Sequence, residues 1–250
     1  MKKVLILLSV LILLPIFVSG CGKNENELLV GTEPTFPPFE YMDEATGKID
    51  GFDIALITEM AKRAGYEVKV SNVAFDGLIA ALQSGNIDVV ASGMSITDER
   101  KASILFTDPY IDAGLSIVVS KNNSSITGEK DLKGKVAGVQ IGTTGADEAN
   151  ALKEKGILKE VKTYNTIDVA FLDLSNGAID CIINDGPVNE AYIKKDSSKS
   201  KIVGDVLVSD QYGFGVAKGS EELVEKLNKA LGEIKADGTY DKLVAKYFSN

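Results

Sequence analysis

The sequence predicts an α/β fold of two similar lobes, because one helix-to-strand unit occurs in it twice. The copies are ALQSGNIDVVAS, from Ala81 to Ser92, and DLSNGAIDCIIN, from Asp173 to Asn184. Each contains the end of an amphipathic helix, a glycine that stops it (Gly85 or Gly177) and a short apolar run that suits a buried strand. The alternative is a chance likeness within one α/β domain.

The predicted strands also indicate where a ligand binds. In open parallel sheets, ligands bind beyond the carboxyl ends of the strands. The segments at the ends of the two repeated strands are Ser92 to Ser95 and Asn184 to Asp185. We expect these segments to face each other across a cleft.

The first half of the chain alternates strands and helices in a βαβαβ order, which implies a largely parallel sheet. The prolines of the EPTFPPFE segment exclude a helix there. The expected elements are a strand over Leu28–Thr32, a helix over Asp53–Ala64, a strand over Val68–Val70, a helix over Phe75–Ser84 and a strand over Ile87–Ala91.

The second half begins a new series, and no low-complexity linker separates the halves, so we expect short, ordered strands to join them. The polar run Lys194–Lys201 is most simply a solvated loop. The expected elements are strands over Ile117–Ser120, Val136–Gln140, near Val161 and over Ile179–Ile183, helices over Ala146–Lys155 and Asp168–Ser175, and a final amphipathic helix through Leu223 to Ile234.

The N-terminus has the pattern of an export signal. Two lysines precede an apolar run, Val4 to Val18, that is shorter than the roughly 20 residues of a bilayer span. An uncleaved anchor helix is the alternative. The Val-Ser-Gly-Cys sequence that ends at Cys21 resembles the lipobox of bacterial lipoproteins, which implies a signal peptide over 1–20, a lipid on Cys21 and a polar tether over 21–27.

Composition excludes several classes of function. Without the signal peptide's two lysines, 25 basic residues face 36 acidic ones, which argues against nucleic-acid binding. The chain has no histidine, which excludes Ser-His and Cys-His nucleophile pairs and histidine-ligated metals. Cys181 lies in an apolar run and is most simply a buried core residue. We expect no cofactor and no metal.

A possible anion site follows the strand that ends near Ala91. In the segment SGMSITDER, Arg100 comes five residues after Ser95, and a guanidinium together with a hydroxyl and its backbone N–H suits a carboxylate. The alternative is that Thr97 caps a helix and Arg100 pairs with Asp98 or Glu99 in solvent.

The other half offers donors and a carboxylate of its own. Gly142 to Gly145 connects a strand to a helix, so its backbone N–H groups favour an anion, although the turn lacks the Walker pattern. An ordinary turn with a threonine cap is the alternative. Asp185 follows the repeated strand and can accept a cation, unless it is a surface residue. Together these groups match the two charges of an amino-acid zwitterion.

Six motifs, in order, extend the argument over almost the whole chain: GTEPTFPPFE, GFDIAL, SGMSITDER, FTDPY, QIGTTG and QYGFGVAKGS. With them the sequence resembles the extracellular solute-binding proteins of polar amino-acid ABC importers, which include the glutamine, histidine and lysine/arginine/ornithine receptors. The resemblance implies two Rossmann-like lobes joined by two crossover strands around a ligand cleft, the type II periplasmic binding protein fold.

The resemblance also implies roles for individual residues. Arg100, helped by Ser95 and Thr144, would hold the α-carboxylate, and the Gly93 carbonyl and the Asp185 carboxylate would hold the α-ammonium. Aromatic rings at Phe36 and Phe75 would enclose the ligand side chain, where a cation–π attraction contributes about 0.5–2 kcal/mol. Each phenylalanine on its own is more simply a core residue.

The side-chain pocket predicts the ligand class. Glu33 matches an aspartate that contacts the side chain in related receptors, and a carboxylate there disfavours acidic ligands. Gln140 stands where some relatives have a lysine. We therefore expect arginine or lysine first and glutamine second.

The resulting prediction is a monomeric, lipid-anchored, extracytoplasmic receptor that delivers an amino acid to an ABC permease and its ATPase. Lobe 1 would span 28–111 and 212–250, and lobe 2 would span 115–209. Two other functions stay open: a cyclic amino-acid dehydratase on the same fold, with Glu33 or Asp185 as its acid, and a ligand-sensing domain.

Overall fold

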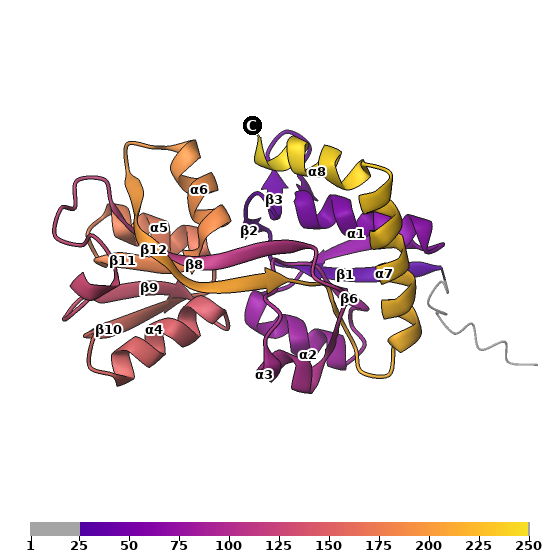
Figure 1. Ribbon diagram of the computed structural model, residues 1–250, viewed down its shortest axis with the longest axis horizontal. Coiled ribbons are helices and arrows are strands. Elements are labelled where there is room, and N and C mark those ends of the chain that lie inside the picture. Colours follow the sequence, from indigo (N-terminus) through magenta and orange to yellow (C-terminus); the bar gives the residue numbers. More distant parts are fainter. Residues whose placement is uncertain (1–25, 250) are drawn as a thin grey trace, which may run out of the picture.

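The computed structural model describes residues 26–249 and divides them between two five-stranded sheets, one in each lobe (Figure 1). The predicted signal peptide and Cys21 lie outside the described residues. Glu27, which the sequence analysis assigned to the tether, begins the first strand. The expected α/β fold of two lobes is confirmed.

The sheet of lobe 1 has the strand order β5-β1-β6-β13-β7. Its β1, β5 and β6 strands run in parallel, as the βαβαβ order predicts, whereas β13 is antiparallel to both of its neighbours. The bounds are β1 Glu27–Thr32, β5 Glu67–Asn72, β6 Val89–Val90, β7 Leu105–Phe106 and β13 Gly215–Val216; a small separate sheet contains β2 Thr35–Phe36, β3 Glu40–Asp43 and β4 Lys48–Asp50.

The sheet of lobe 2 has the order β10-β9-β11-β8-β12. It is mixed, because β9, β10 and β11 are parallel while β8 is antiparallel to both β11 and β12. The bounds are β8 Ile111–Ser120, β9 Val136–Gln140, β10 Glu160–Tyr164, β11 Cys181–Asp185 and β12 Ser200–Tyr212.

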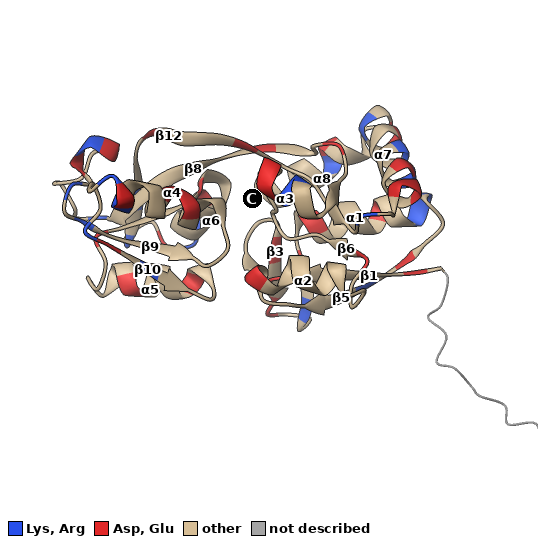
Figure 2. Ribbon diagram, turned by 90° about the horizontal axis from the view of Figure 1, so that it is seen from below, with Lys and Arg blue, Asp and Glu red and all other residues tan. Residues whose placement is uncertain are grey.

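Two long strands join the lobes, where the sequence analysis expected short ones. β8 has 10 residues and β12 has 13, because each is both a crossover and a member of the lobe 2 sheet. They pair with each other across the gap between the lobes, with Ile111 opposite Tyr212 and Leu115 opposite Val208 (Figures 1 and 2).

The described residues contain eight α-helices. Most of the helices that the sequence predicts begin within two residues of the predicted start. The expected helix over Phe75–Ser84 begins instead as a 3₁₀ turn, η1, and part of the expected loop over Lys194–Lys201 belongs to a helix. The bounds are α1 Phe52–Arg63, η1 Phe75–Gly77, α2 Leu78–Gln83, α3 Asp98–Ser103, η2 Glu129–Asp131, α4 Thr144–Glu154, α5 Ile167–Ser175, α6 Gly186–Lys195, α7 Glu221–Ala236 and α8 Thr239–Phe248.

The internal repeat has the same backbone geometry in both lobes. Gly85 follows α2 and Gly177 follows α5, and both have a φ of +73°, which only glycine adopts without strain. The strands that follow, β6 and β11, are buried throughout. The repeat therefore delivers the chain to equivalent strand ends, one in each lobe.

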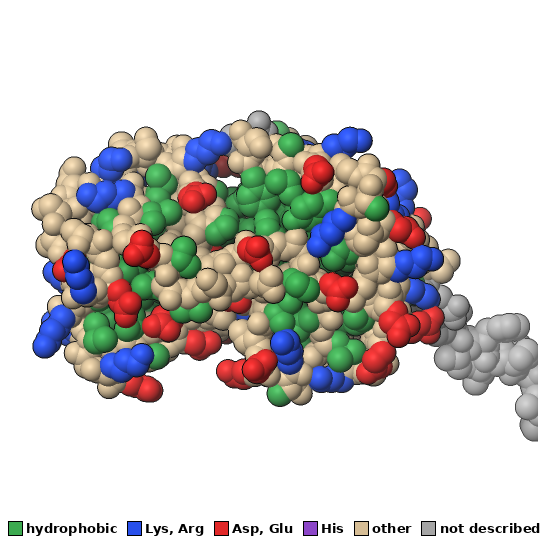
Figure 3. Space-filling view, in the orientation of Figure 1, with side chains coloured by type: hydrophobic (Ala, Val, Ile, Leu, Met, Phe, Trp, Pro, Cys, Tyr) green, Lys and Arg blue, Asp and Glu red, His purple; other side chains and the backbone are tan. Residues whose placement is uncertain are grey.

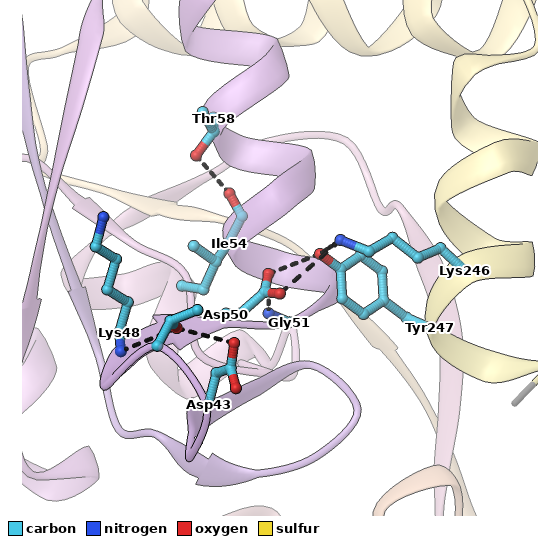
Figure 4. Close-up of polar contacts among 9 residues, drawn as sticks. Asp43, Lys48, Asp50, Gly51, Ile54, Thr58, Lys246 and Tyr247 are labelled. Atoms are coloured by element: carbon cyan, nitrogen blue, oxygen red, sulfur yellow. Dashed lines mark hydrogen bonds and ion pairs between the residues drawn. The ribbon is translucent and has the colours of Figure 1, made fainter.

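The C-terminal helices α7 and α8 pack against α1 and cover lobe 1 (Figure 1). At the start of α1, the Asp50 carboxylate accepts hydrogen bonds from the Gly51 amide (2.8 Å) and the Tyr247 hydroxyl (2.7 Å), and Lys246 lies 3.8 Å from it (Figure 4). These contacts hold the first turn of α1, which reaches the candidate site described below.

Acidic and basic residues occur along the ribbon of both lobes (Figure 2). On the face seen in Figure 3, charged side chains of both signs are scattered over both lobes, and hydrophobic side chains gather near the middle of the molecule. None of the helices over residues 26–249 combines the length and apolar character that a bilayer span requires.

Candidate ligand-binding site

Arg100 lies between the two lobes. It belongs to α3, whose N-terminus is capped by the Thr97 hydroxyl. Its guanidinium donates to the Ser95 carbonyl in lobe 1 (2.8 Å) and to the Gly142 carbonyl in lobe 2 (3.0 Å). The solvent-exposed pairing with Asp98, the alternative from the sequence, is made by Lys101 instead.

The guanidinium of Arg100 is buried and has no carboxylate bonded to it among the described residues. Its carbon lies 5.5 Å from the centre of the Phe75 ring. Burial lowers the pKa of Arg100, and the carboxylates of Asp147, Asp210 and Asp185 partly offset this effect. Because a guanidinium has five N–H donors, Arg100 can bind an anion while it keeps its two carbonyl contacts.

Ser95 and Thr144 meet across the cleft, with their hydroxyl oxygens 3.5 Å apart. Thr143, not Thr144, caps α4: its hydroxyl accepts from the Ala146 amide (3.1 Å) and donates to the Gln140 carbonyl (2.8 Å). The Thr144 hydroxyl is thus available at the N-terminus of an 11-residue helix, a position that favours an anion.

Asp185 ends β11 and is buried, with 3% of its surface exposed. Its Oδ1 atom has no hydrogen-bond partner among the described residues, and the aspartate does not cap α6. Burial raises the pKa of Asp185 to about 7; the neighbouring Tyr212 hydroxyl lowers it and Asp210 raises it further. A buried carboxylate of this kind is stabilised by a cation.

Gly93 lies in lobe 1 with a φ of +49°, and a Cβ atom there would lie 2.9 Å from the Phe36 ring. Its amide donates to Asp53 (2.9 Å), which fixes the turn after β6. Phe36 and Phe75 are both buried and belong to different core clusters, and the Phe75 ring also faces the Arg100 guanidinium.

Glu33 and Gln140 also meet across the cleft. The Gln140 amide donates to Glu33 Oε2 (3.1 Å) and to the Asn165 carbonyl (3.1 Å), and the Thr35 hydroxyl donates to the same Glu33 oxygen (2.7 Å). Burial raises the pKa of Glu33, and the Asp168 carboxylate raises it further. The carboxyl groups of Glu33 and Asp168 therefore lie close enough to interact at this end of the cleft.

Two tyrosines of the cleft were not identified from the sequence. Tyr212 is fully buried, and its hydroxyl lies beside the Asp185 carboxylate. Tyr192, on α6, donates to the Thr35 carbonyl in lobe 1 (2.8 Å). Tyr212 stands in the QYGFGVAKGS motif, which was the available signal for it.

A groove of about 500 Å³ opens between the lobes on the Thr35 and Tyr192 side. Its lining includes Asp168 and Tyr41 but neither Arg100 nor Asp185. Those two residues are enclosed between the lobes, so the groove lies at the edge of the cleft and not at its centre. Among the described residues, no cluster of acidic or cysteine side chains could hold a metal ion.

Residues 28–250 match the family of bacterial extracellular solute-binding proteins, family 3. The chain belongs to this family. Its sequence is 35% identical to that of a probable amino-acid-binding protein, YxeM, of Bacillus subtilis. The matched region covers 100% of this chain and 96% of YxeM.

Solved structures are also similar. An ancestral arginine-binding protein bound to arginine is 48% identical to this chain, with a TM-score of 0.84. The match covers 89% of this chain and 98% of the solved one. An ancestral arginine-binding protein bound to glutamine is 46% identical, with a TM-score of 0.85. The match covers 91% of this chain and 100% of the solved one. The expected resemblance to amino-acid receptors of ABC importers is confirmed.

Proposed function

We propose that this solute-binding protein binds a polar or basic L-amino acid between its lobes, arginine or lysine first and glutamine second, and delivers it to an ABC permease and its ATPase. It would do so as a monomer held at the outer face of the membrane by lipid on Cys21. Lobe 1 would span 28–111 and 212–250, and lobe 2 would span 115–209, boundaries that the two sheets support.

One observation carries the proposal: a buried guanidinium from lobe 1, which bonds to Gly142 of lobe 2, and a buried carboxylate from lobe 2 lie close enough to interact electrostatically. A zwitterion satisfies both groups at once, its carboxylate at Arg100 and its ammonium at Asp185. Burying each ligand charge is tolerable only when it is paired. Ser95, Thr144 and Gly93 would supply the remaining polar contacts.

The opposite end of the cleft supports the ligand class. Glu33, with Asp168 nearby, favours a cationic or amide-bearing side chain, and Gln140 adds no positive charge. Phe36 and Phe75 offer flat apolar walls. Among the similar structures, one ancestral arginine-binding protein is bound to arginine and another is bound to glutamine, which supports both as ligand candidates.

A ligand held by both lobes stabilises the closed state by its preference for that state. Contacts between the lobes already include Arg100 with Gly142, Gln140 with Glu33 and Tyr192 with Thr35. The cleft has groups that suit the two charges of an amino acid, and we infer binding without chemical conversion, which the membership of the solute-binding family supports.

A thermal-shift screen against the twenty amino acids, ornithine and citrulline tests the proposal, because a ligand at 100 times its Kd stabilises the fold by about 2.7 kcal/mol. Arginine or lysine should give the largest shift. Agmatine, which lacks the carboxylate, and N-acetylarginine, which lacks the ammonium, should give none. Equal shifts with these analogues would contradict the two-ended site, and no shift with any amino acid would refute the function.

A further inference from the structure

Two carboxyl groups lie buried behind the proposed ammonium site. Glu40, on β3, and Asp53, in the first turn of α1, are both fully buried. Asp53 Oδ2 accepts hydrogen bonds from the Gly93 amide (2.9 Å) and the Tyr110 hydroxyl (2.6 Å), and Glu40 Oε1 accepts from the Ser92 hydroxyl (3.2 Å).

Each carboxyl group also has an oxygen without a partner. Glu40 Oε2 and Asp53 Oδ1 are buried and make no hydrogen bond within residues 26–249, and none of the ion pairs in that range involves either residue. Two anions buried together without a cation repel each other, and the lower-energy state keeps a proton on one of them.

The surrounding groups strengthen this preference. Burial raises the pKa of Asp53 to about 7, and burial followed by the Asp53 charge raises the pKa of Glu40 well above its ordinary value. Glu33 and Asp185 face Glu40 and add negative charge. The other titratable groups that face the pair are phenols, and none is cationic: Tyr110, Tyr212 and Tyr240.

The pair is connected to the site by hydrogen bonds. Asp53 holds the amide of Gly93, whose carbonyl is proposed to contact the ligand ammonium. Glu40 holds the Ser92 hydroxyl, which accepts from the Glu33 amide (2.9 Å). A ligand ammonium bound at the Gly93 carbonyl and the Asp185 carboxylate is therefore separated from the Asp53 carboxyl by the Gly93 residue alone.

We propose that Glu40 and Asp53 are positioning residues of the ammonium site, that they hold one proton between them in the free protein, and that amino-acid binding releases it. In this step the carboxylic O–H bond breaks, the carboxylate remains behind Gly93 and the proton passes to the buffer. The ligand's ammonium replaces the lost positive charge. The identity of the ligand in this inference rests on the proposed function. The shared proton of Glu40 and Asp53 rests on contacts within lobe 1.

Titration calorimetry with arginine at pH 7, in two buffers of different ionisation enthalpy, counts the protons released. Asp185 contributes its own share, so variants separate the sources. Glu40→Gln and Asp53→Asn should each release fewer protons than the wild-type protein, by roughly half a proton or more. The matched control Glu129→Gln, at an exposed position of lobe 2, should match the wild type. Unchanged proton release in both test variants would overturn the inference.

A second measurement needs no ligand and so separates this inference from the proposed function. In the free protein, the ¹³C carboxyl resonances of Glu40 and Asp53 should move together through one shared titration near neutral pH. If both residues titrate below pH 5, the shared proton does not exist, whether or not amino acids bind. If they titrate as expected but no amino acid produces heat, the failure lies with the proposed function.

Discussion

Replacing Arg100 with alanine tests the proposed carboxylate site most directly. The substitution removes the buried guanidinium that joins the Ser95 and Gly142 carbonyls and that lies over Phe75. A ligand carboxylate would then enter the cleft with no positive charge to pair with it, while Ser95 and Thr144 would still offer hydroxyl groups.

The expected loss is large. Removing one partner of a buried, hydrogen-bonded charge pair costs about 2–5 kcal/mol of binding free energy. At about 1.4 kcal/mol per tenfold, the Kd should rise by roughly 30- to 4,000-fold. Arg100→Lys should give a smaller loss, because lysine keeps the charge but not the planar fork. Hydrogen bonds from a charged group contribute about 1.5–3 kcal/mol each, less than the roughly 5–15 kcal/mol stability of a folded protein, so the variant should stay folded.

Titration calorimetry with arginine, lysine and glutamine gives the Kd values, and thermal unfolding checks the fold. Lys101→Ala is the matched control, since Lys101 is the next residue of α3 but its side chain is exposed and pairs with Asp98. It should bind like the wild type. An Arg100→Ala protein that is folded and binds within about threefold of the wild type would refute the carboxylate assignment.

Four further predictions follow from the same structure. Glu33→Gln should raise the Kd of arginine about tenfold or more and that of glutamine less, as measured by calorimetry; equal changes would remove Glu33 from the specificity pocket. Phe75→Ala should weaken binding of all ligands about tenfold and Phe75→Leu less, whereas wild-type affinity in both would leave the ring a purely structural role. Because burial raises the pKa of Asp185 to about 7, its carboxyl is neutral in more acidic solution, so affinity should fall as the pH drops from 8 to 5; Asp185→Asn should weaken binding and flatten that profile in part, with the Glu40–Asp53 pair accounting for the remainder, and an unchanged profile would count against the ammonium contact. Burial also raises the pKa of Cys181 to about 12, so in a Cys21→Ser variant Ellman's reagent should label Cys181 at pH 8 only after denaturation, and rapid labelling of the native protein would contradict its buried position.

The parts of the fold that the sequence predicted are those with strong local signals. The strand Val136–Gln140 has the predicted bounds, and the glycines after α2 and α5 end both helices in the left-handed conformation that stops them. Elements with weak local signals were not predicted. The three-stranded sheet β2-β3-β4 has strands of two to four residues, which are too short to show a hydrophobic period.

Helix α6 and strand β12 were missed for different reasons. α6 begins with Gly186 and Pro187, a pair typical of a turn, although proline fits the first turn of a helix. β12 begins inside a polar run that favours a loop, and it is held in a strand by its pairing with β8. Both elements depend on contacts that local sequence does not encode.

The same distinction applies to the candidate site. Residues at strand ends and in recognisable motifs, such as Arg100 and Asp185, were identified, and the structure brings them into one buried space. Tyr192 was not, because its partner Thr35 lies 157 residues away in the sequence. The Glu40–Asp53 pair also required the fold, since neither residue lies at the carboxyl end of a predicted strand.

Two of the interlobe hydrogen bonds, those from Arg100 and from Tyr192, are accepted by main-chain oxygens of Gly142 and Thr35. Every amino acid supplies such an oxygen, so a substitution at Thr35 can keep the bond from Tyr192, whereas Gly142, with a φ of +76° and Asp76 beside it, requires glycine. Neither bond depends on an accepting side chain, so residues that contact the ligand can change while these hydrogen bonds between the lobes remain.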